Sequence, residues 1–268
     1  MTDTSAAGSS ARPAPEPAPV RAYDVDGPVD APPIVFIHGT RLTRRMWRAQ
    51  VEALRDEFRV VTLDLPGHGA MADQRFTLRG ASDHVATVIE TAVGRPAIVV
   101  GLSLGGYVAM DLAARRPELV RGLVLSGATA EPVGPRAVPY RALAWVMDHS
   151  SDGAFHTVNA WFFRSRFPSS IADPILADGF WSHGGADALA AIVGERFLPR
   201  LAAYPGATLI LNGEYDPVFR LTSRAFARAA KDARRVRLRG ASHLANLDRP
   251  AAFSVAVRRF ARSVAEPG

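Results

Sequence analysis

Short, almost wholly apolar runs alternate with longer stretches of helical periodicity through most of this 268-residue chain. A strand buried on both faces of a parallel sheet reads as a continuous apolar run, and parallel strands need long crossover connections, which are usually helices. The alternation therefore predicts the α/β class, with a mostly parallel central sheet and helices on both faces. The expected strands cover Ile34–Ile37, Val60–Asp64, Ala97–Val100, Leu123–Ser126, Leu209–Asn212 and Val236–Arg239.

Three of the intervening stretches carry clear helix signals. Trp47, Val51, Leu54 and Phe58 are spaced to share one helix face, and Thr43 precedes them as a candidate N-cap. The other two expected helices cover Leu104–Arg115, which Pro117 ends, and Pro250–Ser263, which has a proline in its first turn.

The stretch between the fourth and fifth expected strands is too long for a connection inside a compact sheet, so it must hold structure of its own. We expect residues 131–204 to form a helical cap over the carboxyl ends of the strands, where open α/β sheets bind ligands. Residues 21–130 and 205–265 then form the core. Residues 1–20 are rich in Ala, Ser and Pro and have almost nothing to bury, which predicts a disordered tail.

Composition excludes several classes of function. The chain has no cysteine, which excludes disulfides, thiolate zinc sites and a cysteine nucleophile. No apolar run approaches the roughly 18 residues of a membrane span, and the first residues lack the pattern of a secretory signal. We therefore expect a cytoplasmic protein with no membrane partner. The net charge of +6 comes from arginines interspersed with acidic residues and accompanied by no recognition motif, so we interpret it as a solvated surface and expect no nucleic-acid partner.

The sequence Gly-Leu-Ser-Leu-Gly, residues 101–105, directly follows one expected strand and directly precedes an expected helix. A serine nucleophile needs such a tight turn so that its hydroxyl stands clear of the sheet, and the flanking glycines permit the strained backbone. We interpret Ser103 as the nucleophile. The Leu104 amide, at the helix amino end, is a candidate donor to an oxyanion. The alternative is a glycine-rich turn with an incidental serine.

Two further turns follow expected strands near the start of the core. His38-Gly39-Thr40 ends the first of them, and the second oxyanion amide usually comes from this loop, so we assign it to Thr40. An ordinary turn is the alternative. In the second turn, Asp64-Leu65-Pro66-Gly67-His68-Gly69, we expect Asp64 to accept hydrogen bonds that stabilise the loop. We expect His38 and His68 to be structural.

The acid and the base are expected after the last two strands. Asp216, in Asn-Gly-Glu-Tyr-Asp-Pro, follows a strand at a place where a carboxylate can accept a hydrogen bond from a histidine. Glu214 is the rival acid. His243 lies in the loop before the final helix, and an imidazole can take the serine proton and return it to the leaving group. The chain order Ser, Asp, His is that of the α/β-hydrolases.

At these five places, over about residues 21–265, the chain resembles the α/β-hydrolase superfamily, in its lactonase, esterase and cofactor-free haloperoxidase-like branch. The resemblance implies an α/β-hydrolase fold and a mechanism without metal or coenzyme. It implies that Ser103 attacks an acyl carbon, His243 carries the proton and Asp216 orients the histidine. Hydrolysis of an ester, lactone or related acyl bond of a small, largely apolar substrate is the leading hypothesis.

Two other functions stay open on the sequence alone. Perhydrolysis or cleavage of a carbon–carbon bond would use the same triad, and a catalytically silent ligand-binding protein is possible on this fold. The homo-oligomeric state is also open. The cap is rich in aromatic residues, which either roof the substrate pocket or hold the cap helices together. Arg164 and Arg166 are either a fork for a substrate carboxylate or solvated side chains. The residues that we expect to contact substrate are Trp145, Trp161, Phe162, Phe163, Arg164, Phe167 and Trp181.

Overall fold

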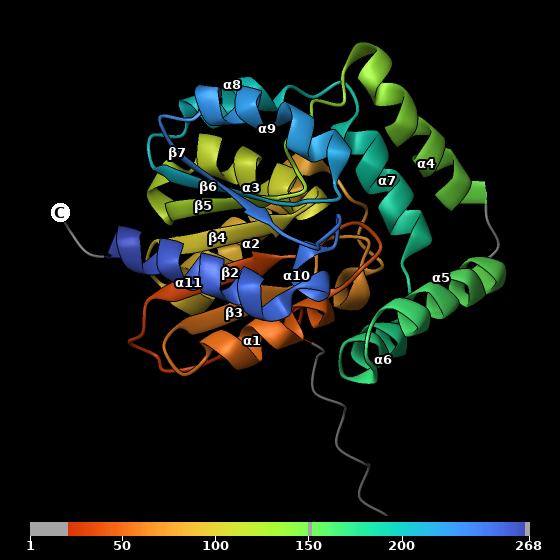
Figure 1. The fold of residues 1–268 in the computed structure, drawn as a ribbon, viewed down its shortest axis with the longest axis horizontal. Helices are drawn as coiled ribbons and strands as arrows, with labels where there is room; N and C mark the ends of the chain where they lie inside the picture. Colours follow the sequence, from red (N-terminus) through yellow and green to blue (C-terminus); the bar gives the residue numbers. More distant parts are fainter. Residues whose placement is uncertain (1–20, 150–151, 266–268) are drawn as a thin grey trace, which may run out of the picture.

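A twisted sheet of seven strands forms the centre of the computed structural model, which describes residues 21–149 and 152–265 (Figure 1). The predicted disordered tail, residues 1–20, lies outside the described residues. The strand order is β1-β3-β2-β4-β5-β6-β7, and only β1 runs antiparallel to its neighbour. The strands are β1 (Tyr23–Asp26), β2 (Pro33–Ile37), β3 (Arg59–Leu63), β4 (Ala97–Leu102), β5 (Val120–Ser126), β6 (Ala207–Gly213) and β7 (Asp232–Leu238).

Alternate residues of the buried strands divide the core into two layers. In β2, Ile34 and Phe36 join the cluster that includes side chains of α1 and α11, whereas Val35 and Ile37 join the cluster on the opposite face. On that opposite face lie α2, α3, α8 and α9. The bounds of these helices are α1 (Arg48–Leu54), α2 (Leu78–Val88), α3 (Leu104–Arg115), α8 (Phe197–Ala203), α9 (Pro217–Ala229) and α11 (Pro250–Ala265).

The predicted helices are confirmed, with small shifts at their ends. Thr43 is an N-cap, and its side chain accepts a hydrogen bond from the Arg45 amide. The helix expected to carry the apolar face from Trp47 to Phe58 is shorter than predicted. Trp47 ends a 3-10 helix, Val51 and Leu54 lie in α1, and Phe58 lies beyond the end of α1. The shorter helices are η1 (Arg44–Trp47), η2 (Gly69–Met71), η3 (Ile89–Val93), η4 (Pro117–Leu119), η5 (Gly134–Ala137) and α10 (Ala245–Asp248).

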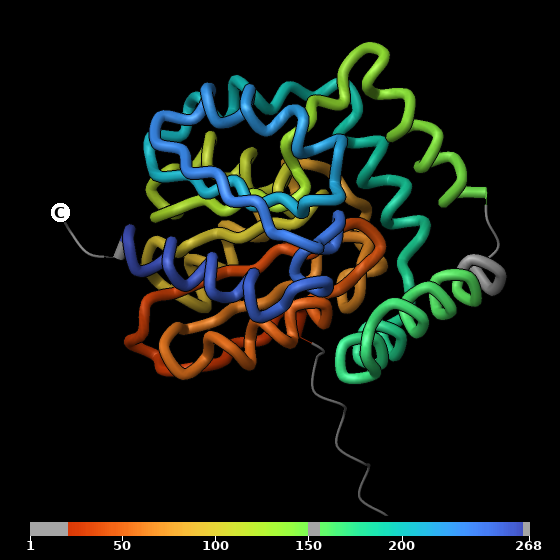
Figure 2. Tube along the Cα trace, in the orientation of Figure 1, coloured from red at the N-terminus to blue at the C-terminus, as the bar shows by residue number. Residues whose placement is uncertain are grey.

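Four helices of the expected cap lie together beside the sheet layers, as the trace in Figure 2 shows. They are α4 (Val138–His149), α5 (Asp152–Arg166), α6 (Ser169–Asp178) and α7 (Ser182–Ile192). The start of α7 meets the loops that follow β2 and β3: the Trp181 amide donates to the Arg41 carbonyl, and Gly184 packs against the backbone of Gly67. The start of α7 therefore lies against the loops at the carboxyl ends of β2 and β3. None of the described helices is long and apolar enough to cross a membrane.

The two edge strands differ from the sequence-based expectation. β1 was not expected, because its sequence Tyr-Asp-Val-Asp is half polar and none of its residues is buried. The last strand was expected as a buried run over Val236–Arg239. It is instead the exposed edge strand β7, which starts at Asp232 and buries only Leu238. An edge strand is paired on one side only, so charged side chains are tolerated there and discourage pairing with other chains.

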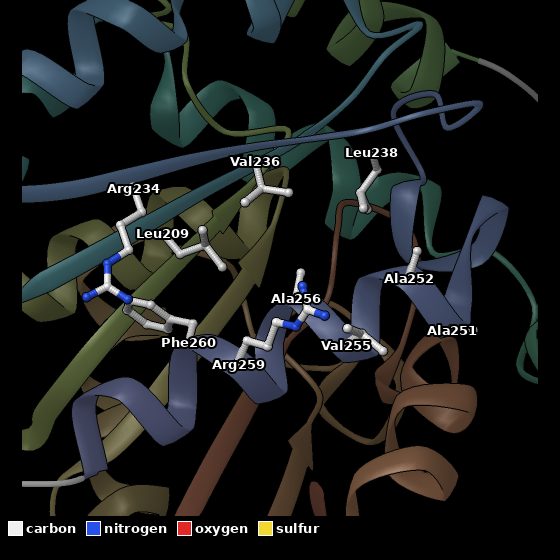
Figure 3. A pocket seen from close by; sticks show the side chains of 10 residues that line it. All are labelled: Leu209, Arg234, Val236, Leu238, Ala251, Ala252, Val255, Ala256, Arg259 and Phe260. Atoms are coloured by element: carbon white, nitrogen blue, oxygen red, sulfur yellow. The ribbon is translucent and has the colours of Figure 1, made fainter.

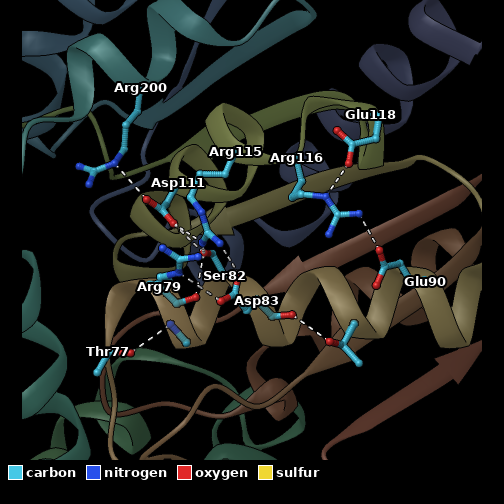
Figure 4. A network of polar contacts seen from close by, with 12 residues as sticks. Thr77, Arg79, Ser82, Asp83, Glu90, Asp111, Arg115, Arg116, Glu118 and Arg200 are labelled. Carbon is cyan, nitrogen blue, oxygen red and sulfur yellow. Dashed lines mark hydrogen bonds and ion pairs between the residues drawn. The ribbon is translucent and has the colours of Figure 1, made fainter.

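A buried carboxylate holds three of the outer helices together. Asp111 on α3 accepts a hydrogen bond from Ser82 of α2 at 2.6 Å and pairs with Arg115 at 3.2 Å and Arg200 of α8 at 3.0 Å (Figure 4). Because the charge is both paired and hydrogen-bonded, its burial is tolerated. The network joins α3 to α2 and α8, and so it helps to fix the helix whose amino end supports Ser103.

Candidate active site

Ser103 lies at the turn from β4 into α3, in a backbone conformation that few residues adopt. Its φ and ψ are 53° and −116°, and only one other non-glycine residue of the described chain has a positive φ. Such a conformation persists only where the surrounding structure imposes it. Here the Ser103 amide donates to the Ser126 carbonyl of the neighbouring strand at 2.8 Å, and α3 begins at the next residue.

Glycines on both sides of Ser103 are required by close backbone contacts. A Cβ atom on Gly101 would lie 2.3 Å from the Gly105 carbonyl oxygen, and a Cβ atom on Gly105 would lie 2.2 Å from the carbonyl oxygen of Ile37. Neither distance is compatible with a side chain, and neither neighbour is a flexible group. The tight turn therefore depends on the Gly-x-Ser-x-Gly pattern, as the sequence predicted.

Asp216 and His243 are joined by a hydrogen bond. Nδ1 of His243 lies 2.8 Å from Oδ2 of Asp216, and the Asp216 side chain is only 6% exposed. Because Nδ1 donates to the carboxylate, Nε2 is left as the imidazole's acceptor. Glu214 is engaged elsewhere: its Oε2 accepts a hydrogen bond from the Gly240 amide at 3.0 Å. Of the two rival acids, Asp216 is thus the one that meets the imidazole.

Gly127 connects the imidazole to the serine turn. It follows Ser126, whose carbonyl accepts the Ser103 amide, and a Cβ atom on Gly127 would lie 2.7 Å from Cε1 of His243. The histidine ring therefore lies directly over the residue next to the Ser103–Ser126 pair. Within the described residues Ser103 Oγ makes no hydrogen bond to His243. Such contacts are often long before substrate binds.

Two residues that the sequence analysis missed support the histidine. The Phe219 ring stacks on the imidazole, with centroids 5.0 Å apart and planes 27° apart. Asn212, buried at the end of β6, accepts from the Gly127 amide at 3.0 Å and donates to the Phe219 carbonyl at 3.1 Å. One amide side chain thus ties together the residue under the imidazole and the residue stacked on it. The sequence signal for Asn212 was its place at the end of a strand, and the signal for Phe219 was its place one turn after Asp216.

The two backbone amides proposed for an oxyanion are both available. The amides of Thr40 and Leu104 donate no hydrogen bond within the residues that the structure describes. The loop that carries Thr40 approaches the serine closely, because a Cβ atom on Gly39 would lie 3.6 Å from Cβ of Ser103. Leu104 is the first residue of α3, where amides lack partners inside the helix.

His38 and His68 form hydrogen bonds that join the loop after β2 to the loop after β3. Nε2 of His38 accepts from the Leu65 amide at 2.9 Å, and Nε2 of His68 accepts from the Arg41 amide at 3.1 Å. Each Nδ1 lies within 2.9 Å of a carbonyl oxygen and must carry the proton. Burial lowers the pKa of His38 to about 4 and that of His68 to about 3. Both rings are therefore neutral and structural.

The protein should lose stability in mild acid because of these two histidines. Unfolded, each imidazole binds a proton near pH 6.5, whereas the folded protein keeps both neutral to about pH 4. Their contribution is complete above about pH 6.5 and falls as the pH drops, by up to about 1.4 kcal/mol per pH unit for each ring. Urea unfolding at pH 7 and pH 5 measures the decline. His68→Gln should make it shallower, and the exposed His183→Gln should not; equal slopes would contradict this account.

Asp64 accepts hydrogen bonds as expected. Its carboxylate receives the amides of Arg44 and Ala70, both at 2.9 Å, and pairs with the Arg44 guanidinium. The side chain is fully buried, so it fixes the turn before His68 and does not reach the serine.

Arg166, on cap helix α5, binds the loop that carries His243. Its Nη2 donates to Asp248 Oδ1 at 2.7 Å and to Ser242 Oγ at 3.0 Å. Asp248 in turn accepts both the amide and the hydroxyl of Ser242 at 2.6 Å. Because Ser242 directly precedes His243, this network joins the cap to the position of the imidazole. Arg166 is thus engaged by the protein itself and is not a fork open to a substrate carboxylate.

Arg166→Met should slow turnover by roughly tenfold to a hundredfold on every ester tested, because the nearly buried Asp248 carboxylate loses its charged partner and Ser242 loses an anchor. The loss should fall on kcat, with the pH profile displaced, since the affected group is the histidine. Arg164→Met is the matched control: it removes an exposed arginine two residues away that has no polar contact in the described structure. Comparable losses in the two variants would refute this role for Arg166.

The residues that we expected to contact substrate differ in how far they are exposed to solvent. Trp145, Trp161 and Arg164 are exposed, and Phe162 is 40% exposed. Phe163 and Phe167 are buried and pack on each other, with centroids 5.5 Å apart. Trp181 is half-buried at the loop that carries Thr40, and its buried indole Nε1–H has no acceptor among the residues that the structure describes.

Tyr140, on α4, was not predicted but lies near the acid. Its hydroxyl is 2.9 Å from that of Tyr107, which donates to the Ala130 carbonyl. Tyr140 must therefore be the donor to Tyr107. Burial raises the pKa of Tyr140, and the negative charge of Asp216 adds to the rise. The phenol of α4 thus lies within electrostatic range of the Asp216 carboxylate.

Known proteins resemble this chain over nearly its whole length. Residues 34–256 match the alpha/beta hydrolase family. The chain is 27% identical to 3-oxoadipate enol-lactonase 1 from Acinetobacter baylyi, over 91% of this chain and 93% of that protein. A solved hydrolase from Pseudomonas aeruginosa PA01 is 30% identical with a TM-score of 0.76, over 89% of this chain and 92% of that one. The solved enol-lactonase from Burkholderia xenovorans LB400 is 26% identical with a TM-score of 0.74, over 89% and 95% of the two chains.

The fold and the family match agree. A serine turn, a carboxylate and an imidazole follow parallel strands in the order expected of this family. This chain belongs to the alpha/beta hydrolase family.

Proposed function

We propose that the protein is a serine hydrolase that cleaves an ester, lactone or related acyl bond of a small, largely apolar substrate. One observation carries the proposal: the buried Asp216 carboxylate holds His243 by Nδ1, directly over the residue that follows the Ser103–Ser126 pair. An imidazole oriented by a buried carboxylate beside a serine turn supports a triad that performs acyl transfer.

The reaction follows from these positions. Ser103 Oγ attacks the carbonyl carbon while Nε2 of His243 takes the hydroxyl proton, and the carbonyl oxygen becomes an oxyanion that the amides of Thr40 and Leu104 stabilise. Collapse of this intermediate expels the alkoxide of the ester or lactone, which receives the proton from His243. Water, deprotonated by the same imidazole, then attacks the acyl carbon to form a second intermediate. Its collapse breaks the bond to Ser103 Oγ, which takes the proton back from His243, and the carboxylic acid product leaves. Asp216 keeps the imidazole oriented and stabilises its charged form.

The relatives support the choice of acyl bond. Two of the three similar proteins described above are named as enol-lactonases.

The described residues hold no cluster of three or more His, Cys, Asp or Glu side chains able to bind a metal ion. The groups that the proposed mechanism uses all come from the chain itself.

A substrate panel tests this proposal. Esters, lactones, thioesters and diketones, with and without peroxide, are compared in the wild type and in Ser103→Ala. We expect the wild type alone to hydrolyse esters or lactones. Cleavage limited to diketones, or turnover only with peroxide, would replace the proposed reaction by another at the same serine, and Ser103-independent turnover would reject the site.

The cap should select the substrate without supplying a catalytic group. Trp181 contacts the loop of Thr40 and has a buried donor, whereas Trp161 is 71% exposed. Trp181→Ala should therefore change the ranking of acyl and ring substituents in kcat/KM while a small activated ester is still cleaved, and Trp161→Ala should leave the ranking unchanged. If Trp181→Ala, shown to be folded, reduced turnover uniformly on all substrates, the cap would contribute to the chemistry itself.

A further inference from the structure

The positive charge of the protein is concentrated in one short segment. Residues 217–240, from the start of α9 to just beyond β7, contain seven arginines and one lysine against a single acid, Asp232. Eight cations and one acid give an excess of seven, whereas the whole chain carries +6. The remaining residues together are therefore almost neutral. The even mixture of charges expected from the composition does not describe this surface.

Four of these arginines line a groove between α9 and β7. Arg220 and Arg224 lie one helical turn apart, and Arg235 and Arg237 lie two residues apart on the strand, so each pair shares one face of its element. The groove has a volume of about 480 Å³. Arg234 precedes Arg235 in β7, so its side chain lies on the other face of the strand. There it lines a separate, more apolar groove beside α11 (Figure 3).

The groove carries a strong positive potential. No carboxylate lines it, and none of its four arginines forms an ion pair with another residue of the described structure. Like charges around a concave surface focus the field and attract anions. A guanidinium offers a planar pair of donors that matches the oxygen atoms of phosphate. Two such pairs lining one groove can therefore hold two linked phosphate groups.

Size and lining distinguish the classes of anion. The volume is that of a pocket for a small molecule. The lining holds no aromatic ring on which a base could stack, which disfavours single-stranded nucleic acid. We propose that the groove between α9 and β7 is a binding site for a small multivalent phosphate anion, held by Arg220, Arg224, Arg235 and Arg237.

The groove adjoins the active site through a single residue. Asn212 lines it and also bonds Gly127 and Phe219, both of which contact His243. The phosphate is therefore either part of the substrate or a separate effector. The two sources share the same recognition chemistry and differ in their effect on ester kinetics.

Calorimetric titration of inorganic pyrophosphate into the full chain at low ionic strength tests the site. We expect one saturable site per chain, weakened by added salt and weakened at least tenfold in R235Q/R237Q and in R220Q/R224Q. The control is R136Q/R141Q, which removes the same charge from exposed cap arginines and should change the affinity less than twofold. Thermal melting checks that each variant is folded.

Kinetics with a small ester distinguish a phosphate carried by the substrate from a separate phosphate effector. Competitive inhibition by pyrophosphate identifies a phosphate carried by the substrate, and a change in kcat identifies a separate effector. In both cases the variants weaken the pyrophosphate binding, and binding without any kinetic effect would reject both sources. Absence of saturable binding, or equal weakening in the control variant, would overturn the proposal. Tighter binding of a DNA duplex, or equal binding of the tricarboxylate tricarballylate, lost in the same variants, would overturn the assignment to a small phosphate.

Discussion

Ser103→Ala should abolish turnover and leave the protein folded. The hydroxyl stands at a turn whose shape is set by the backbone, by glycine contacts and by the bond to Ser126, so its removal costs chemistry and little packing. Members of a triad act as a unit, so His243→Ala should be nearly as severe. We expect both variants to lose on the order of 10⁴ to 10⁶ in kcat on an activated ester.

Circular dichroism and urea unfolding serve as the control for this loss, because an unfolded variant would be inactive for a trivial reason. Both variants should unfold cooperatively, close to the wild-type midpoint. Ordinary activity in either folded variant would remove Ser103 or His243 from the mechanism.

Asp216→Asn should reduce kcat by roughly 10⁴ in a folded protein. The carboxylate now accepts the Nδ1 proton at 2.8 Å, and an amide in its place can donate to Nδ1 instead, which favours the wrong tautomer. Glu214→Gln is the matched control, two residues away in the same turn. Within the described residues its carboxylate meets only the Gly240 amide, and an amide oxygen can accept that bond equally well. We expect less than a fivefold loss from it.

The two acid variants are best compared by kcat on one ester, with unfolding curves alongside. A large loss in Glu214→Gln together with near-normal activity in Asp216→Asn would transfer the role of acid to Glu214. Equal, modest losses in both would mean that neither carboxylate orients the imidazole.

The parts of the fold that the sequence predicted are those with local signals. The five central strands are continuous apolar runs because both of their faces are buried, and each ends in a motif of glycine, proline or polar residues. Ser103 and Asp216 follow two of these strands and His243 follows the edge strand β7, so a parallel sheet brings all three to one edge whatever the details of packing. Position after a strand thus carries most of the information about the candidate site.

The edges of the sheet lacked this signal. β1 is short and half polar, and β7 is dominated by arginines, because an edge strand is buried on neither side as fully as a central one. The same exposure explains why the basic groove was overlooked. Its four arginines lie 17 residues apart at most in the chain, but a count over the whole sequence averages them with distant acids.

Contacts between distant segments could not be predicted from one sequence. Arg166 meets Asp248 across 82 positions. His38 and His68 each accept a hydrogen bond from a backbone amide 27 positions away. Nothing in the local pattern around Arg166 separates it from the exposed Arg164. The exposed positions of Trp145 and Trp161 likewise depend on how α4 and α5 pack, which composition alone does not determine.

Covalent labelling tests the central claim most directly. A fluorophosphonate reacts with an activated serine hydroxyl and with few other groups, so the labelled protein, analysed by intact mass and peptide mapping, reports which residue is the nucleophile. The account predicts one adduct per chain, on Ser103, formed slowly in His243→Ala and absent from Ser103→Ala. An unlabelled wild-type protein, or an adduct on a different serine, would contradict it.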